Sequence, residues 1–289
     1  MLPAFLQQSL SVQYDENTLQ TILQGYGAER PVSFRVNTLR ASAEEVISEL
    51  TERGVRLTPV PWYRDAFYTS AHEAVIQETE VYREGKIYLQ SLSSMLPPLV
   101  LQAQAGESIL DMTAAPGGKT TQISALTEGK ALVTACERDS GRFSRLEYNV
   151  KKQGAPRVTL LHQDALKLSE FFRFDRILLD APCSGSGTIN LNGKIDFSEK
   201  LVSGCVKTQR ALLKKAWGLL KRGGTLVYST CSILRQENEE AVKELRFLDT
   251  DLAPVALARD IPVVTSPWGT TVLPTELYEG FFISCIKKL

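Results

Sequence analysis

The spacing of apolar and polar residues changes along this chain at about residue 87. Before that point, amphipathic spacing predicts a helix around Asn17–Gln24, and alternation predicts a half-buried strand at Ser33–Thr38. A second helix is expected over 43–53, because Gly54 supplies a typical stop, and the short strand V-R-L-T follows it. Residues 1–86 are therefore expected to form a small α/β module.

From residue 87 onward, strands alternate with helices, which is typical of a mostly parallel sheet. The expected strands are Ser108–Thr113, Ala131–Glu137, Val158–His162, Asp175–Asp180 and Gly224–Thr230, and the expected helices are Gly118–Leu126, Asp139–Gln153 and Val206–Leu220. The final F-F-I-S-C-I-K-K, after the turn-rich W-G-T-T, predicts an antiparallel hairpin at the edge of the sheet. Gly85 is expected to be the hinge, so residues 87–289 form the second domain of this prediction.

A glycine-rich turn joins the first of these strands to a helix, in the segment I-L-D-M-T-A-A-P-G-G-K-T at 109–120. Gly117 and Gly118 let the backbone approach a ligand, and the N-terminus of the following helix offers free N–H groups. The segment is not a P-loop, because Ala114 stands where the first glycine of that motif belongs. ATP binding is therefore disfavoured.

Two acids follow the next two strands. Glu137 ends the second strand, 26 residues after Asp111, where an acid commonly binds ribose hydroxyls. Asp164 follows the third strand and is placed to accept a hydrogen bond from an adenine amino group. The order of these features favours S-adenosylmethionine in a Rossmann-like class I methyltransferase over NAD; the alternative is a helix-capping turn with two surface acids. The candidate cofactor-binding residues are Ala114, Ala115, Pro116, Gly117, Gly118, Lys119, Thr120, Glu137, Arg142, Asp164 and Asp180.

The composition is that of an ordinary globular chain, with 43% hydrophobic and 23% charged residues. No apolar run approaches the roughly 20 residues that span a bilayer, and the N-terminus has no basic leader. Five cysteines, without a C-x-x-C pair, argue against a disulfide framework or a zinc site. A cytoplasmic protein with no bound metal and no membrane partner is expected.

Charge is unevenly distributed, although the net charge of the chain is zero. Residues 141–230 contain 16 Lys and Arg against 7 Asp and Glu, a net charge of +9. Such a field is typical of nucleic-acid binding, although each single cation is more simply a solvated helix residue. Small α/β modules like 1–86 often bind RNA through a sheet face. RNA is thus the expected partner, with Arg35 and Asn37 as candidate contacts.

Two cysteines follow strands of the second domain, in D-A-P-C at Asp180–Cys183 and S-T-C-S at Ser229–Ser232. Methylation of cytosine at C5 requires a cysteine nucleophile and a carboxyl group, because C5 becomes nucleophilic only after a thiolate adds to C6. An acid near N3 stabilises the adduct, and a base must remove the C5 proton before the thiol leaves. Asp180, Cys183 and Cys231 are the candidate catalytic residues. An amino-methyltransferase would instead carry N-P-P-Y or D-P-P-Y.

These motifs resemble the nucleolar-protein/Sun (Fmu) family of RNA cytosine-5 methyltransferases. The resemblance covers most of the chain and is carried by F-R-V-N-T, Y-L-Q-S-L-S-S-M-L-P, D-M-T-A-A-P-G-G-K-T, D-A-P-C-S-G-S-G-T, V-Y-S-T-C-S-I with Glu237–Asn238, and E-G-F-F-I-S. It implies a class I methyltransferase fold with a mostly parallel seven-stranded sheet and an antiparallel edge hairpin. It also implies methylation of structured RNA, ribosomal or transfer, with Cys231 as nucleophile and Cys183 assisting release of the product.

Two differences from the family pattern are visible. Thr113 stands where the family usually has a cysteine before A-A-P-G, at a position with no catalytic role. Many bacterial members also carry a C-terminal RNA-binding domain that follows the last motif matched here. Substrate selection is then expected to depend on the N-terminal module, the basic faces, or a protein or ribosomal partner. Two alternatives stay open: a DNA cytosine-5 methyltransferase with Cys183 as nucleophile, and a non-catalytic RNA-binding or ribosome-assembly factor.

Overall fold

A computed structural model describes residues 2–193, 195–247 and 250–289, which form two compact units. The continuous unit comprises residues 31–164. The split unit comprises residues 1–30 together with 165–289, so its two segments are separated in the sequence by the whole continuous unit. This division differs from the expected domains, 1–86 and 87–289, because the first thirty residues pack with the last part of the chain.

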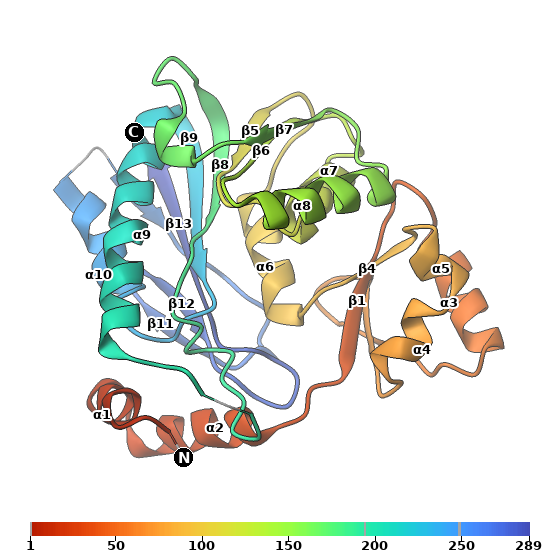
Figure 1. The fold of residues 1–289 in the computed structure, drawn as a ribbon, viewed down its shortest axis with the longest axis horizontal. Coiled ribbons are helices and arrows are strands. Elements are labelled where there is room, and N and C mark those ends of the chain that lie inside the picture. The colour runs from red at the N-terminus through yellow and green to blue at the C-terminus, as the bar shows by residue number, and fades with distance from the viewer. Residues whose placement is uncertain (1, 194, 248–249) are drawn as a thin grey trace. The chain divides into compact units, whose positions relative to one another are not determined.

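The continuous unit contains two sheets. Its elements are β1 (Val32–Val36), α3 (Ala43–Glu52), β2 (Thr58–Pro59), β3 (Ala66–Thr69), α4 (Glu73–Gln77), α5 (Glu80–Arg83), β4 (Ile87–Leu89), α6 (Leu92–Leu101), β5 (Ser108–Asp111), α7 (Gly118–Leu126), β6 (Leu132–Glu137), α8 (Ser140–Gln153) and β7 (Val158–His162). The first sheet is antiparallel in the order β2-β3-β1-β4. The strands β5, β6 and β7 are parallel neighbours, and α7 and α8 pack against β6 (Figure 1).

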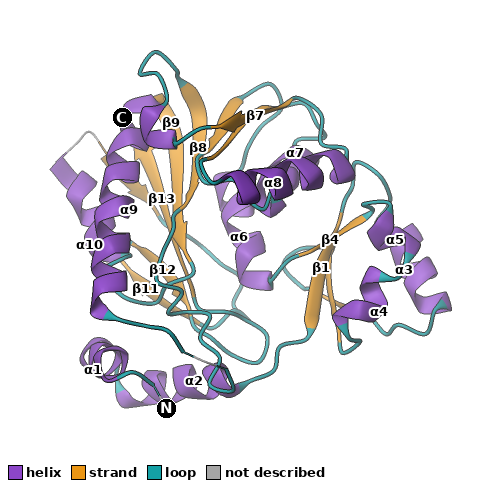
Figure 2. Ribbon diagram, in the orientation of Figure 1, coloured by secondary structure: helices purple, strands orange, loops and turns teal. Residues whose placement is uncertain are grey.

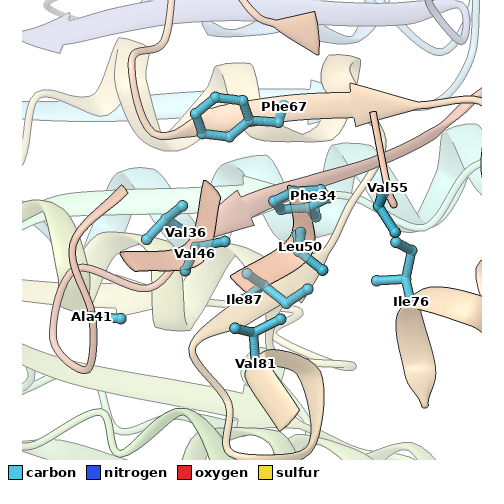
Figure 3. Packing of buried hydrophobic residues seen from close by; sticks show 10 residues of the cluster. All are labelled: Phe34, Val36, Ala41, Val46, Leu50, Val55, Phe67, Ile76, Val81 and Ile87. Carbon is cyan, nitrogen blue, oxygen red and sulfur yellow. The ribbon is translucent and has the colours of Figure 1, made fainter. Parts of the chain in front are cut away.

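The first sheet has its own hydrophobic core (Figure 3). Phe34 and Val36 point from β1 to one face, where the apolar stripe of α3 meets them through Val46 and Leu50. A capping box starts α3, since Ser42 and Glu45 each accept a hydrogen bond from the other's backbone N–H. The sequence therefore determines both the start of this helix and the side that it buries.

The split unit begins and ends with segments that are far apart in the sequence. Its elements are α1 (Ala4–Gln13), α2 (Glu16–Gly27), the 3₁₀ helix η1 (Ala165–Lys167), β8 (Phe174–Asp180), α9 (Glu199–Leu219), β9 (Leu220–Thr230), α10 (Glu239–Lys243), the 3₁₀ helix η2 (Glu244–Phe247), β10 (Thr250–Ala253), β11 (Val263–Ser266), β12 (Gly269–Val272) and β13 (Phe281–Lys288). Figure 2 distinguishes its long helix α9 from the strands, and α9 packs along β8 and β9.

The strands of the split unit are ordered β11-β12-β13-β9-β8, with β10 also pairing with β13. Only the β8–β9 pair is parallel among the strand pairs described in this unit. The predicted antiparallel C-terminal strands are confirmed. The hairpin at the edge is β11–β12, whereas β13 lies inside the sheet between β12 and β9.

The N-terminal helices α1 and α2 pack against the late part of the chain. Leu6, Leu10 and Ile22 join a core cluster with Ile233 and Leu273. The Tyr26 hydroxyl donates to the Ser186 carbonyl at 2.5 Å. A Cβ atom at Gly25 would lie 2.1 Å from the Pro274 carbonyl oxygen, so only glycine allows this close approach.

Most of the predicted elements are present. The five predicted strands correspond to β5–β9 and the three predicted helices to α7–α9. The largest differences are at the starts of two elements: α9 begins earlier, at Glu199, and β9 begins at Leu220 with a register shift opposite Phe174 and Arg176, while the other boundaries of these strands and helices differ by at most two residues. Among the described residues, nine strands (β5–β13) follow the first sheet, two more than the seven that the family resemblance implies. Within the same described part of the chain, no helix is long and apolar enough to cross a membrane.

Candidate active site

The two motif cysteines lie together in the split unit. Asp180 ends β8 and pairs in register with Ser229 of β9, so the loops after these parallel strands leave the sheet at the same edge. One loop carries Cys183 and the other carries Cys231, and their Sγ atoms are 3.0 Å apart. Both side chains are partly exposed, and both are free thiols. The prediction that the motifs bring these cysteines to one site is supported by this geometry.

Asp180 stands at the base of the same site. Its Oδ1 accepts a hydrogen bond of 2.8 Å from the Ser229 hydroxyl, two residues before Cys231. The carboxyl group is therefore oriented by the strand that also carries the second cysteine. All three candidate catalytic residues thus belong to one edge of the β8–β9 pair.

A buried acid connects the two cysteine loops. Glu237 has no exposed surface, and its carboxylate accepts hydrogen bonds from the Ser184 backbone N–H (2.8 Å) and the Ser184 hydroxyl (2.5 Å). The Ser232 hydroxyl donates to it at 2.6 Å and the Gln209 amide at 3.1 Å. The sequence reveals Glu237 only as part of a motif, because an acid within Q-E-N-E-E has the local pattern of a solvated turn.

The environment of Cys183 favours its protonated form. The hydrogen bond with Cys231, burial, and the charges of Cys231 and Glu237 raise the pKa of the Cys183 thiol well above 9.0. Burial also raises the pKa of Cys136, on β6, to about 12 and that of Cys205, on α9, to about 11. Cys285 is buried on β13, where burial raises its pKa. The raised pKa values keep these three thiols protonated, which is typical of unreactive cysteines.

The candidate cofactor loop lies in the continuous unit, between β5 and α7. Gly117, the residue before α7, has a φ of 107° and no side chain to cap the helix. The Thr120 hydroxyl donates to Asp111 Oδ2 at 2.7 Å, which fixes the loop to the end of β5. A Cβ atom at Gly118 would lie 2.9 Å from the Tyr88 ring. Position 118 therefore requires glycine, because the start of the helix packs directly against the Tyr88 ring.

The candidate acids lie at the same edge of the parallel strands. Glu137 ends β6 opposite His162 of β7, and its carboxylate accepts a hydrogen bond of 2.9 Å from the Asp139 backbone N–H. Arg142 donates to the Ala115 carbonyl at 2.9 Å and lies 3.6 Å from Glu137 Oε2. The structure therefore brings Glu137 and Arg142 together with the loop.

The remaining candidate residues are also accounted for. Asp164 follows β7, and its Oδ2 lies 3.9 Å from Arg138 Nη1. Lys119 donates to the Ser94 hydroxyl at 2.7 Å, and Pro116 is exposed. Asp180, also a candidate for cofactor binding, belongs to the split unit with the cysteines. No group of three His, Cys, Asp or Glu residues suited to a metal ion occurs among the described residues.

The two candidate RNA contacts, Arg35 on β1 and Asn37 directly after it, are buried, so the prediction that they contact RNA is wrong. Arg35 has no exposed surface; it donates to Gln90 Oε1 (3.0 Å), the Gly118 carbonyl (3.0 Å) and the Thr121 hydroxyl (2.7 Å). Burial lowers its pKa to about 10. Asn37 is held by the carbonyls of Gly85 and Gln153. Both faces of β1 are covered, so alternation along the strand does not distinguish an exposed side.

Other cations of the basic segment do reach the surface. Arg173, Lys214 and Lys215 line a surface hollow of about 500 Å³ beside α9. Phe171, in the loop before β8, is 96% exposed. Exposed cations and exposed aromatic rings are both features that surfaces for single-stranded nucleic acid use.

Comparison with known proteins agrees with this description. Residues 98–287 match the family model for the 16S rRNA methyltransferase RsmB/F, and residues 2–92 match the model for the N-terminal domain of the 16S rRNA methyltransferase RsmF. A ribosomal RNA small subunit methyltransferase F from Shewanella sediminis is 38% identical over 271 residues, which cover 89% of this chain and 57% of that protein. The enzyme of the same name from Vibrio cholerae is 35% identical over 277 residues and is covered to 59%. The chain thus spans less than two thirds of these relatives' length.

Solved structures show the same fold. A methyltransferase homolog from Pyrococcus horikoshii superposes with a TM-score of 0.82 at 32% identity, with both chains fully covered. NSun6 from the same organism, with SFG, superposes with a TM-score of 0.90 at 24% identity, covering 99% of this chain and 98% of that one. The predicted methyltransferase fold and the predicted family are confirmed. The chain belongs to the RsmB/F family of 16S rRNA methyltransferases.

Proposed function

We propose that this protein transfers a methyl group from S-adenosylmethionine to C5 of a cytosine in 16S rRNA, through a covalent cysteine–cytosine adduct. The observation that carries the proposal is the thiol pair: Cys183 and Cys231 lie 3.0 Å apart at the ends of parallel neighbouring strands, with Asp180 at the end of one of them. A packing role needs no second thiol and no acid at the same edge. Covalent catalysis at C5 uses a thiol nucleophile, an acid near N3 and a group that transfers a proton, and these three residues can supply them.

In this mechanism Cys231 is the nucleophile. Its thiolate adds to C6 of the cytosine, which forms an S–C6 bond and makes C5 electron-rich, with Asp180 donating a hydrogen bond or proton at N3. C5 then takes the methyl group. Removal of the C5 proton restores the C5–C6 double bond and breaks the S–C6 bond, so the Cys231 thiolate leaves methylated RNA.

Cys183 is proposed to assist that last step. Its raised pKa keeps the thiol protonated near neutral pH, so it can donate a proton to the sulfur that leaves C6, while a separate base removes the C5 proton. Its Sγ atom is also within hydrogen-bonding distance of the departing sulfur of Cys231. A DNA cytosine-5 methyltransferase would use the cysteine at position 183 for attack, and a raised pKa disfavours that role.

The cofactor loop fits the proposed S-adenosylmethionine, which supplies the methyl group as a sulfonium. The uncapped start of α7 suits the carboxylate of such a molecule, since helix N-termini attract anions. The Glu137 carboxylate is proposed to accept hydrogen bonds from the ribose hydroxyls of the cofactor, and the Asp164 carboxylate from its adenine amino group. Ala114–Thr120 and Arg142 shape the loop, and Asp180 is proposed to contact the cofactor at the methyl-donor end.

RNA binding is proposed for residues 1–86 and for the basic faces of 87–289. The boundary proposed at residue 86 is close to the gap between the two family models, 2–92 and 98–287. A protein or ribosomal partner is proposed to contribute to substrate selection. Because its proposed substrate is ribosomal RNA, we place the protein in the cytoplasm.

The proposal is tested by bisulfite sequencing of RNA from a deletion strain, with the wild-type strain and a complemented strain beside it. Loss of one 5-methylcytosine in 16S rRNA, restored by the intact gene and not by a Cys231→Ser copy, is the expected result. Loss of a tRNA modification would reassign the substrate. An unchanged pattern in all RNA would favour a ribosome-assembly factor that keeps the fold without the activity.

A further inference from the structure

Glu237 joins the two cysteine loops beside the residues that carry the thiols, in addition to direct hydrogen bonds between the Ser186 and Ser232 hydroxyls and from the Gly187 N–H to the Cys231 carbonyl. Its carboxylate receives both the backbone N–H and the hydroxyl of Ser184, the residue that follows Cys183. It also receives the hydroxyl of Ser232, the residue that follows Cys231. One buried carboxylate therefore contacts the immediate neighbour of each thiol.

A third donor completes this arrangement from α9. The Gln209 amide donates to Glu237 Oε1 at 3.1 Å and to the Pro182 carbonyl at 3.0 Å, so both residues flanking Cys183 are held. The backbone of Glu237 is also fixed, because its carbonyl accepts from the Tyr228 hydroxyl inside the sheet. The acid is thus anchored to β9 and the loops are anchored to the acid.

The chemistry of the group explains why an acid stands there. Four donors converge on two oxygens, and only a carboxylate offers that many acceptor sites without a donor of its own. In a Glu237→Gln variant, an NH₂ group would replace one of the two carboxylate oxygens. That NH₂ group would face groups that now donate hydrogen bonds to the carboxylate, among them Ser184 and Ser232. Such a mismatch inside a buried network displaces the groups around it.

We propose that Glu237 is a positioning residue that keeps Cys183 and Cys231 in contact, so that one thiol can add to the base while the other donates a proton to the departing sulfur. The catalytic consequence rests on the proposed function. The claim that Glu237 holds the two sulfur atoms in contact is independent of the proposed function, because it can be tested in the protein without substrate or cofactor.

The experiment measures how fast the two thiols form a disulfide in the protein without RNA or cofactor. Diamide serves as the oxidant: it takes up the two thiol hydrogens as the S–S bond forms and is itself reduced to a hydrazine. The Cys183–Cys231 cross-link is quantified by peptide mass spectrometry in wild type, Glu237→Gln and Lys288→Gln. Lys288 is the control because its Nζ also donates twice, to the Trp217 and Leu220 carbonyls, away from the cysteine loops.

Glu237→Gln should slow the cross-link by roughly 10- to 100-fold, since reactions between held groups are very sensitive to displacements of about 1 Å. Lys288→Gln should lower the melting temperature without slowing the cross-link. If Glu237→Gln does not fold, the Ser184→Ala/Ser232→Ala variant removes both hydroxyl donors and tests the same claim. Cross-linking at the wild-type rate in the folded variant overturns the proposal.

A second readout addresses catalysis. Methyl transfer by Glu237→Gln should show a kcat lowered by roughly 100-fold with KM values for RNA and S-adenosylmethionine within about twofold. Equal losses in kcat for Glu237→Gln and Lys288→Gln would mean general destabilisation and would overturn the catalytic part. Wild-type protein that cross-links normally and methylates nothing would instead refute the proposed function alone.

Discussion

Cys183 Sγ lies 3.0 Å from Cys231 Sγ, although 48 residues separate the two positions in the chain. The two sulfur atoms meet because β8 and β9 run parallel and in register, so each strand delivers its motif to the same edge. Neither motif on its own predicts that a second thiol lies beside its cysteine. The contact has a chemical effect, since the hydrogen bond with Cys231 raises the pKa of the Cys183 thiol.

The first prediction concerns the roles of the two thiols. Cys231→Ser should abolish methylation and form no covalent complex with RNA, because a hydroxyl is a far weaker nucleophile at neutral pH. Cys183→Ala should still attack and transfer the methyl group but stall before release. A protein–RNA adduct that survives denaturing electrophoresis is therefore expected for Cys183→Ala.

Cys205→Ala, a change of a thiol on α9, is the control and should behave as wild type. An adduct with Cys231→Ser and none with Cys183→Ala would reverse the assignment and favour the DNA-type mechanism. A packing role for Cys183 would produce only a small loss of stability.

The second prediction concerns pH. The pKa of Cys183 lies well above 9.0, and the largest cause is its hydrogen bond with Cys231. Alkylation of Cys183 by iodoacetamide should therefore rise only as the pH increases beyond 9, because the thiolate is the reactive form. Cys231→Ala removes the largest cause, so the alkylation profile of Cys183 should shift to lower pH. Peptide mass spectrometry across a pH series measures both profiles, and an unshifted profile would contradict the coupling.

The third prediction concerns the cofactor. Glu137→Ala should weaken binding of S-adenosylmethionine by about 1–3 kcal/mol, the usual cost of losing a hydrogen bond to a charged group. Glu128→Ala is the matched control, because that carboxylate is 76% exposed in the same unit and faces Lys130. Calorimetry should separate the two variants. Equal affinities would exclude Glu137 as a cofactor ligand.

The fourth prediction separates RNA-binding cations from buried ones. Affinity for RNA should fall steeply with salt, and the Lys214→Gln/Lys215→Gln pair should reduce the slope by about 1 for each phosphate that the variant no longer neutralises. Arg35→Met should leave that slope unchanged but lower the melting temperature, because each buried acceptor that it leaves unsatisfied costs about 1–3 kcal/mol. Filter binding between low and high salt measures the slopes. A flat salt dependence in the wild type would point to a small-molecule substrate.

The sequence predicts best where local pattern and local structure coincide. Val158–His162 and Gly118–Leu126 are predicted to the residue, because an apolar run and a glycine-rich turn have the same limits in the sequence and in the fold. The place of β13 between β9 and β12 is not predictable in this way, because it depends on tertiary pairing and not on the local pattern of β13 itself. The prediction for Arg35 fails for a related reason: a strand covered on both faces has no exposed side for alternation to reveal. Glu237 is visible as a motif residue, but its burial depends on loop residues that lie 5 and 53 positions away.

The packing of α1 and α2 into the split unit has a consequence for biosynthesis. Residues 4–27 are made before the continuous unit, yet the side chains that cover Leu6, Leu10 and Ile22 include Ile233 and Leu273, which are made after it. The continuous unit has all of its own residues by position 164 and can acquire its structure while translation proceeds. The apolar side chains of α1 and α2 stay uncovered during that period. A chaperone that recognises apolar nascent segments would find one in α1 and α2 until Ile233 and Leu273 have been made.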